Sequence, residues 1–349
     1  MKILITGNMG YIGPSVVDQL HGSYRDAELI GLDSGFFAHC LTGASMLPEV
    51  RIHKQIFGDV RKITSETLKD VYAVIHLAGI SNDPIGNTFA QATDEINYLS
   101  SIQLAKLSKE MGVKRFIFAS SCSVYGFAEG GPRKENDELN PLTAYARSKI
   151  GTEKGIAGLA SNDFVITSLR FATACGMSER LRLDLVVNDF VAGAVVSKKI
   201  DILSDGTPWR PLIHIKDMAR AIDWGVGRNA SNGGAFLAVN TGSDDWNYKV
   251  KDLAEGVAKV IPGVHISINK DAVPDKRSYQ VNFELFRRLA PKYQPQIDLT
   301  ETIRGLKDGL ENMKFKNSDY RNSDFMRLKV LTGFRASNQL NDKLEWVRS

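Results

Sequence analysis

The sequence predicts an α/β fold, in which a doubly wound parallel sheet carries a second, smaller α/β unit from the later part of the chain. In the first half, short runs that are apolar throughout alternate with segments of helical spacing. Such runs suit parallel strands that helices cover on both faces, because neither face of the strand then meets water. After Arg170 the segments become shorter and turn signals become denser, which indicates a change of architecture.

The expected strands of the large sheet are short. They span residues 3–6, 28–32, 71–77, 115–119 and 164–169. The helical segments span residues 11–20, about 95–111 and about 143–160. Strands that alternate with helices imply right-handed βαβ units. Gly112 ends the second of these helices, and Pro141 precedes the third.

Turn sequences such as Asn232-Gly233-Gly234 divide the second half into short pieces. We therefore expect two domains. The first covers residues 1–170 with 212–240 returning to it, and the second covers 171–211 and 241–349. Residues 314–335 are mildly basic, and we interpret them as a solvated face.

The composition excludes several classes of protein. The chain has 44 Lys and Arg against 40 Asp and Glu, and a net charge of +4 is too small to indicate a nucleic-acid partner. Three sparse cysteines without a C-x-x-C pair argue against a disulfide framework and a structural zinc ion. No apolar stretch is long enough to span a bilayer. We therefore expect a cytoplasmic protein with no metal site and no membrane contact.

Three glycines, Gly7, Gly10 and Gly13, follow the first expected strand and open the first helix. Glycine lets the backbone turn sharply and approach a pyrophosphate, whose charge is favoured by the free N–H groups at the helix N-terminus. The spacing is G-x-x-G-x-x-G, not the G-x-G-x-x-G of the general fingerprint. The position between strand and helix nevertheless predicts a dinucleotide-binding turn.

Two aspartates follow expected β segments. Asp33 ends the second strand, where its carboxylate can accept hydrogen bonds from the adenosine ribose and would repel a 2′-phosphate. This position favours NAD over NADP. Asp59 can accept a hydrogen bond from the adenine amino group, or it can simply be a loop residue.

Tyr145 and Lys149 lie one helical turn apart on the same face of the expected 143–160 helix. A nearby ammonium favours the phenolate, so the phenol can exchange a proton with a substrate hydroxyl. Lys149 can also hydrogen-bond the nicotinamide ribose. Ser121 lies at the carboxyl end of an expected strand, where doubly wound sheets bind their ligands.

In this order, four motifs resemble the extended short-chain dehydrogenase/reductase family, and within it the nucleotide-sugar epimerases, dehydratases and ketoreductases. They are Thr6-Gly7-x-x-Gly10-x-x-Gly13, His76-Leu77-Ala78-Gly79, Ser120-Ser121-x-x-Val124-Tyr125-Gly126 and Tyr145-x-x-x-Lys149. The resemblance covers most of the chain. It implies a Rossmann domain that binds NAD and a second domain that binds a nucleotide sugar. Tyr145 is then the general acid/base, Lys149 its electrostatic partner and Ser121 the third catalytic residue.

The resemblance also implies the binding residues. The cofactor-binding set is Gly7, Met9, Gly10, Tyr11, Ile12, Gly13, Asp33, Asp59, Val60, Leu77, Ala78, Gly79, Ser81, Asn97, Ala119, Ser120, Tyr145, Lys149 and Phe171. The substrate-binding set is Ser121, Cys122, Ser123, Asn188, Arg210 and Arg277. Asn188 and the two arginines resemble the family's contacts to the substrate diphosphate, for which two guanidinium forks are well suited. We expect residues 82–84 and 182–185 to shape the sugar pocket, and His76 and His214 to be structural.

The family resemblance leaves more than one reaction open. Sugar 4,6-dehydratases of this family carry Asp-Glu directly after the catalytic Thr, and here those positions are Cys122 and Ser123, which disfavours dehydration. A C4 epimerase with bound NAD and a 4-keto-sugar reductase with external NAD(P)H would use the same catalytic residues. Asp33 favours the epimerase.

Two other classes and the oligomeric state complete the expectations. A steroid-type dehydrogenase would not need Asn188, Arg210 and Arg277 as a diphosphate clamp. A non-catalytic dinucleotide sensor would typically have lost Tyr145 or Lys149. The helices at 95–111 and 143–160 match those that pair in family dimers, so we expect a homodimer, although both apolar stripes could equally face the sheet.

Overall fold

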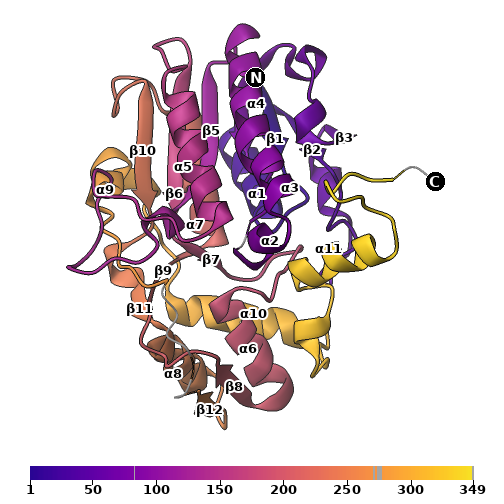
Figure 1. Ribbon diagram of the computed structural model, residues 1–349, viewed down its shortest axis with the longest axis vertical. Helices are drawn as coiled ribbons and strands as arrows, with labels where there is room; N and C mark the ends of the chain where they lie inside the picture. The colour runs from indigo at the N-terminus through magenta and orange to yellow at the C-terminus, as the bar shows by residue number, and fades with distance from the viewer. Residues whose placement is uncertain (82, 270–271, 273–276, 348–349) are drawn as a thin grey trace.

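The structure, a computed structural model, describes residues 1–81, 83–269, 272 and 277–347. Figure 1 shows a large sheet with helices on both faces, and a smaller group of helices and short strands below it. Within the described residues, the large sheet has seven strands in the order β10-β6-β5-β4-β1-β2-β3, and every pair is parallel. The chain runs outward from β1 in one direction and then from β4 in the other, which makes the sheet doubly wound. The predicted fold class is confirmed.

The strands of this sheet match the predicted runs closely. They are β1 (Lys2–Thr6), β2 (Glu28–Asp33), β3 (Lys54–Phe57), β4 (Val71–His76), β5 (Arg115–Ser121), β6 (Val165–Phe171) and β10 (Phe236–Thr241). The β segment expected before Asp59 is β3, for which the sequence gives no bounds because it begins with Lys54 and Gln55 at the open edge of the sheet. The apolar pattern does not predict β10, which forms the other edge.

Apolar residues on both sides of each strand hold the layers together. Ile3 and Ile5 point into one core cluster with residues of α1 (Gly13–Ser23) and α7 (Ile215–Gly227), whereas Leu4 points into the other, with residues of α4 (Ser100–Glu110) and α5 (Ala144–Ala157). All three side chains are fully buried. Burial on both faces explains why the strand is apolar throughout.

The expected 95–111 helix is not one regular helix. A π-helical turn (Asp94–Leu99) precedes α4, and short helices α2 (Asp83–Thr88) and α3 (Ala90–Thr93) precede it in turn. The hydroxyls of Ser101 and Thr152 both donate to the carbonyl of Asn97, at 2.6 Å and 3.0 Å. Side-chain donors of this kind compete with the regular helical hydrogen bond, which favours a wider turn.

The smaller layer contains two short sheets. Its strands are β7 (Thr173–Cys175), β9 (Trp209–His214) and β11 (Asn247–Lys249) in one sheet, and β8 (Lys199–Ile202) and β12 (His265–Ile268) in the other. Its helices are α6 (Val186–Ser197), α8 (Val250–Val260) and α10 (Leu299–Asn312), whereas α9 (Glu284–Leu289) packs against β10 of the large sheet. In the segment 212–240, α7 packs on α1 and β10 pairs with β6, whereas residues 212–214 belong to β9 and pair with β7.

After α11 (Arg327–Ala336), residues 337–347 form a C-terminal segment that returns to the β2 side of the large sheet (Figure 1). The indole of Trp346 donates to the Ser34 carbonyl at 2.6 Å, and Arg61 donates to the Lys343 carbonyl at 2.8 Å. The Trp346 ring also contacts Phe36, with 5.7 Å between ring centres. The segment therefore covers the loop that follows β2.

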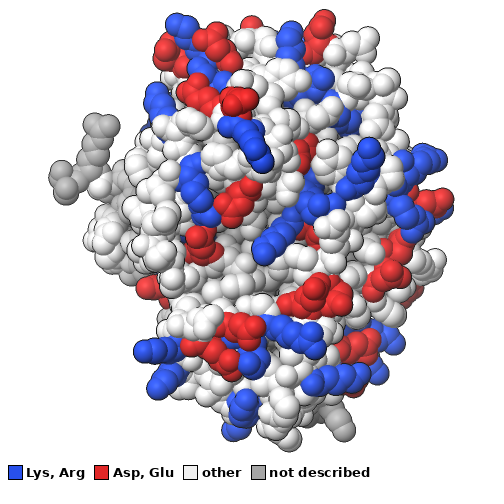
Figure 2. All heavy atoms as spheres, turned by 180° about the vertical axis from the view of Figure 1, so that it is seen from behind, with Lys and Arg blue, Asp and Glu red and all other residues white. Residues whose placement is uncertain are grey.

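The surface matches the charge balance. Figure 2 shows basic and acidic side chains interspersed over one face of the molecule.

In the part of the chain that the structure covers, no helix is long and apolar enough to cross a bilayer.

Candidate active site

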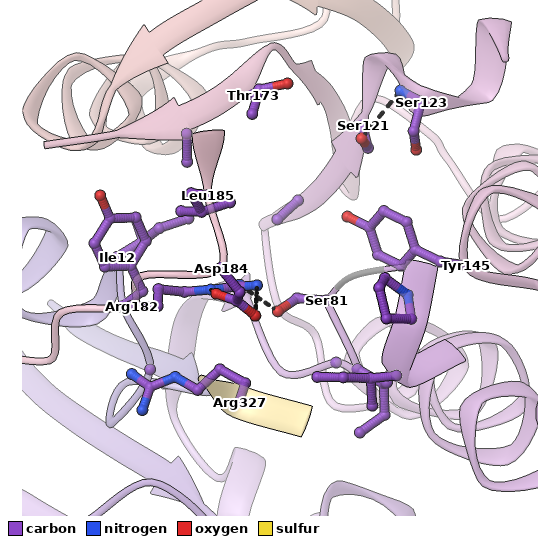
Figure 3. A pocket seen from close by; sticks show the side chains of 18 of the residues that line it. Ile12, Ser81, Ser121, Ser123, Tyr145, Thr173, Arg182, Asp184, Leu185 and Arg327 are labelled. Atoms are coloured by element: carbon purple, nitrogen blue, oxygen red, sulfur yellow. Dashed lines mark hydrogen bonds and ion pairs between the residues drawn. The ribbon is translucent and has the colours of Figure 1, made fainter. Parts of the chain in front are cut away.

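A cavity of about 840 Å³ lies at the carboxyl edge of the large sheet, against the smaller layer. Thr6 lies level with Leu32 of β2 and with His76 of β4, so the residues that follow these three strands meet at one edge. The chain leaves β1 and β4 in opposite directions, and doubly wound sheets bind ligands at such a switch point. Figure 3 shows this cavity from close by.

The glycine turn forms the floor on the β1 side. Gly7 has a φ of +75°, and a Cβ there would lie 2.5 Å from the backbone nitrogen of Ala78. A Cβ on Gly13 would lie 1.8 Å from the carbonyl oxygen of Asn8. A side chain at either position would therefore clash with backbone. Gly13 begins α1, so the positive end of that helix faces the cavity and fits a diphosphate.

Asp33 lies beside this turn, at the end of β2. Its two carboxylate oxygens accept hydrogen bonds from the backbone N–H groups of Met9 and Gly35, at 3.0 Å and 2.8 Å. Burial raises the pKa of Asp33 from its ordinary value, and the two backbone donors oppose this shift. The carboxylate is thus held in place at the cavity wall, with lone pairs left for ligand hydroxyls.

A loop of residues 77–81 follows β4 and lines the cavity. The buried amide of Asn97 accepts a hydrogen bond from the Ile80 N–H at 2.7 Å and donates to the Ile80 carbonyl at 2.8 Å. Ser81 accepts a hydrogen bond from Arg182 at 2.7 Å, and Arg182 also pairs with both carboxylate oxygens of Asp184. The loop is therefore fixed from the helix side and from the smaller layer.

Ser121, Tyr145 and Lys149 line one wall of the cavity. Figure 3 shows the Tyr145 and Ser121 side chains directed into it. The Lys149 ammonium is buried, donates to the Ala119 carbonyl at 2.7 Å and lies 5.5 Å from the centre of the Tyr145 ring. Burial lowers the pKa of Lys149 to about 8, and the charge of Glu153 partly opposes this shift.

A buried ion pair supports this wall from behind. Glu153, one turn after Lys149 on α5, pairs with Arg170 of β6 at 2.7 Å and accepts from Ser120 of β5 at 2.6 Å. Thr143 caps α5 by accepting from the Ala146 N–H at 3.1 Å. These contacts fix α5 against the two strands that carry Ser121 and Phe171.

Most of the residues predicted for the site lie together at this cavity. The lining includes Gly7, Gly10, Tyr11, Ile12, Gly13, Asp33, Asp59, Val60, Leu77, Ala78, Gly79, Ser81, Ala119, Ser120, Ser121, Ser123, Tyr145, Lys149, Phe171, Arg210 and Arg277. Met9, Asn97, Cys122 and Asn188 do not line it. Met9 contributes its backbone N–H to Asp33, and Asn97 positions the 77–81 loop.

Asn188 and Cys122 differ most from their predicted roles. The fully buried Asn188 amide donates to Tyr11 and to the Arg182 carbonyl, and it accepts from the Gly176 N–H. With these groups engaged inside the protein, the side chain braces α6 against the glycine turn and does not line the cavity. The Cys122 thiol donates to the Arg170 carbonyl at 3.0 Å, beneath the cavity wall.

The two predicted diphosphate arginines lie close together. Arg210 of β9 donates to the Arg277 carbonyl and to the Trp209 carbonyl. His76 and His214 are structural. His76 lies between Thr6 and Ser101 at 2.7 Å from each, and His214 accepts from the Lys216 N–H at the start of α7. Of the expected sugar-pocket residues, Asn82 lies outside the described residues.

Sequence reasoning missed Thr173 and Arg327, which also line the cavity. Arg327 falls in the segment that the sequence predicts to be solvated, yet only 2% of its surface is exposed. The mildly basic composition of that segment gave no sign that one of its arginines turns inward. Thr173 lies two residues after the end of β6 and begins β7, and the end of a parallel strand is the signal that could have found it.

Comparison with known proteins agrees with this geometry. A model of the NAD dependent epimerase/dehydratase family matches residues 3–242. YtcB of Bacillus subtilis (strain 168), an uncharacterized UDP-glucose epimerase, is 30% identical over 241 residues, which are 65% of this chain and 73% of YtcB. A putative UDP-glucose 4-epimerase of Methanocaldococcus jannaschii is 24% identical over 326 residues, covering 89% of this chain and 98% of that protein.

Among solved structures, MoeE5 in complex with UDP-glucuronic acid and NAD has the same fold, with a TM-score of 0.76 and 23% identity. The match covers 89% of this chain and 99% of MoeE5. The glycine turn, Asp33 and the 77–81 loop provide a cradle that fits NAD. The family match spans more than half of the chain. The chain therefore belongs to the NAD-dependent epimerase/dehydratase family and is an enzyme whose cofactor is NAD.

Proposed function

We propose that the enzyme inverts C4 of a nucleoside-diphosphate hexose through a 4-keto intermediate. The observation that carries this proposal is the convergence of the Tyr145 phenol and the Ser121 hydroxyl on one cavity that also contains the NAD cradle. The relatives named above as UDP-glucose epimerases support the substrate class and the reaction.

The catalytic wall supplies proton transfer. The Tyr145 phenolate accepts the proton of the C4 hydroxyl, and the nearby ammonium of Lys149 stabilises the phenolate. The Ser121 hydroxyl hydrogen-bonds the same substrate oxygen and holds it against the phenol. When bound, NAD would accept the hydride from C4 and would return it to the other face of the sugar after the keto sugar has rotated in the site. Tyr145 then returns the proton to the new alkoxide.

The rest of the cavity suits the remaining parts of the substrate. Arg210 and Arg277 line it at the smaller layer and can bind the diphosphate as two guanidinium forks. The buried hydroxyl oxygen of Ser123 has no hydrogen-bond partner among the described residues, and it is available to a sugar hydroxyl. Directly after Ser121, the Cys122 thiol is buried outside the cavity lining and donates to the Arg170 carbonyl, so it is not placed to act as the base of a dehydratase.

The test is an assay without added cofactor. We expect the purified protein to contain NAD and to interconvert the C4 epimers of UDP-, dTDP- or GDP-hexoses. Stoichiometric consumption of NADPH with a 4-keto sugar, and no epimerisation, would identify the reductase instead. Bound NAD with neither activity on any nucleotide sugar would indicate a dinucleotide sensor.

Tyr145→Phe removes the acid/base group and leaves the ring. We expect turnover to fall roughly a hundredfold or more, which is the usual contribution of such a group, while the protein still binds NAD. Turnover of epimerisation and NAD titration check the two expectations. Unchanged turnover would remove Tyr145 from its proposed role.

A further inference from the structure

Arg327, the first residue of α11, has an unusual environment for a buried arginine. It lines the cavity with only 2% of its surface exposed. Its Nη2 donates to the Arg180 carbonyl at 2.8 Å, and the guanidinium carbon lies 4.3 Å from the centre of the Phe37 ring. Its Nη1 has no hydrogen-bond partner within the described residues. A buried donor without an acceptor costs free energy, so this atom needs a partner that the protein does not supply.

Some other buried arginines among the described residues have a carboxylate partner. Arg180 pairs with Glu49 at 2.8 Å, although its Nε has no hydrogen-bond partner among these residues, and Arg182 pairs with Asp184 at 2.7 Å. Arg228, which is also 2% exposed, has no carboxylate partner in the described part of the chain, but its guanidinium donates to three backbone carbonyls and to Thr167. Arg228 does not line the cavity, and its hydrogen bonds to the protein are those of a structural arginine. Arg327 differs from it in two ways: it lines the cavity, and its Nη1 has no partner among the described residues.

The charge of Arg327, like its Nη1 donor, indicates an anionic ligand, because no carboxylate pairs with this guanidinium in the described part of the chain. Burial lowers the pKa of Arg327 to about 10, and the nearby Cys40 and Asp184 side chains oppose this shift only in part. An isolated buried cation is costly unless an anion accompanies it. Arginine offers a planar fork that matches the oxygens of a phosphate. An anionic ligand with phosphate oxygens would satisfy both requirements.

The position of the side chain indicates which ligand this is. Phe37, on which the guanidinium stacks, follows Asp33 in the loop after β2, and Phe36, Phe37 and Leu331 line the cavity with it. In Figure 3 the guanidinium lies on the Ile12 side, away from Ser121 and Tyr145. This is the dinucleotide half of the cavity, and NAD carries negative charge only on its diphosphate. The glycine turn from Gly7 to Gly13 contains no Lys or Arg that could balance that charge.

We propose that Arg327 binds a phosphate oxygen of the NAD diphosphate through Nη1. The C-terminal helix α11 thereby provides the cation that the glycine turn lacks. The inference requires NAD as the cofactor, and it does not depend on the C4 reaction.

Binding of NAD to the nucleotide-free protein tests the proposal without an activity assay. Arg327→Met removes the charge and the donors, and Lys329→Met is the matched control because Lys329 is exposed on the same helix. We expect Arg327→Met to raise the Kd for NAD about ten- to hundredfold, the range of one charge-assisted hydrogen bond. Lys329→Met should leave it unchanged. In the absence of NAD, Arg327→Met should unfold at the same temperature as the wild type or higher, because an uncompensated buried cation is gone.

Three results would overturn the assignment. An unchanged Kd for NAD together with a lower unfolding temperature would make Arg327 a structural residue. A higher Kd for UDP with an unchanged Kd for NAD would assign the guanidinium to the diphosphate of the substrate. If Arg327→Met does not fold, Arg327→Gln removes the charge and keeps a polar side chain, and an unchanged Kd for NAD in that variant would also contradict the proposal.

Discussion

Asp33 is the residue that we expect to set the choice between NAD and NADP. Its carboxylate lies at the cavity wall, held by the Met9 and Gly35 N–H groups. Asp33→Ala should raise the Kd for NAD about ten- to hundredfold, because the ribose hydroxyls lose a charged acceptor. The Kd for NADP should rise much less. Titration with both dinucleotides measures the ratio of affinities. Asp26→Ala, which removes an exposed carboxylate just before β2, is the control, and the same NAD/NADP ratio in both variants would refute the ribose assignment.

Lys149 makes stability depend on pH in a defined direction. Burial lowers its pKa to about 8 from an ordinary value of 10.5. Between these values the folded protein holds fewer protons than the unfolded chain, so the stability contributed by this site rises with pH. The wild type should therefore gain stability relative to Lys149→Met as the pH rises from about 7 to about 10.

Urea unfolding of both proteins across this range measures the change. Lys154→Met is the control, because Lys154 is exposed on the same helix and should show no such trend. A constant difference between wild type and Lys149→Met would contradict the pKa shift. Burial of the Lys149 ammonium lowers the stability of the protein, but it also keeps the ammonium close to Tyr145, where the proposed proton transfer needs it.

Single residues also show where prediction from sequence stops. The sequence predicts four site residues from their positions in the strands and helices. Gly7 follows the first strand, Asp33 ends the second, and Tyr145 and Lys149 lie one helical turn apart. Asn188 could not be judged in this way, because its burial depends on the Tyr11 hydroxyl and the Gly176 N–H, which lie far away in the chain. Arg327 was misjudged for the same reason, since its contacts with Phe37 and Arg180 exist only in the folded chain.

Among the elements, the π-helical turn at Asp94–Leu99 links the helix layer to the catalytic edge. Asn97 in this turn holds both backbone groups of Ile80. Asn97→Ala should lower the free energy of unfolding by about 1–3 kcal/mol, since two buried backbone groups lose their partner. It should also lower turnover through the 77–81 loop. Urea unfolding and the epimerase assay measure both effects.

Gln91→Ala is the matched control for Asn97→Ala, because it removes an exposed amide from α3, just before the same turn. It should change neither stability nor turnover. Full stability in Asn97→Ala would show that the loop is held by its other contacts, such as the Ser81–Arg182 hydrogen bond.

Prediction of elements from the sequence succeeds for the central strands and fails at the edges. β1, β4 and β5 are covered on both faces, so their apolar runs are unmistakable. β3 lies at an edge, with a burial pattern that leaves half of its residues exposed, and its sequence therefore lacks that signal. The π-helical turn escaped prediction because one of the hydroxyls that favour it belongs to Thr152, which is far from it in the sequence.

At the level of the whole molecule, we propose that the helices α4 and α5 form the interface of a homodimer. Tyr98 and Ile102 pack against α5 within the chain, where a Cβ on Gly151 would lie 2.9 Å from the Tyr98 ring. Leu99, between them in sequence, is 52% exposed and is available to a second copy. An isologous contact of this kind closes as a twofold dimer.

Leu99→Glu should therefore produce a monomer at concentrations at which the wild type is a dimer. Light scattering coupled to size-exclusion chromatography measures the mass. Val50→Glu is the control, because Val50 is 62% exposed on a 3₁₀ turn away from these helices. A dimeric Leu99→Glu, or a monomeric wild type, would contradict the proposed interface.

The contact of Trp346 with the loop after β2 gives the enzyme an internal optical probe. The indole is 42% exposed, whereas Trp224 and Trp246 are 5% and 7% exposed in the core. It lies beside Ser34, the residue next to Asp33, so we expect a bound dinucleotide to change the surroundings of the indole. The emission of Trp346, on top of that of the half-buried Trp209 and the two core tryptophans, should then report the arrival of the coenzyme without a label.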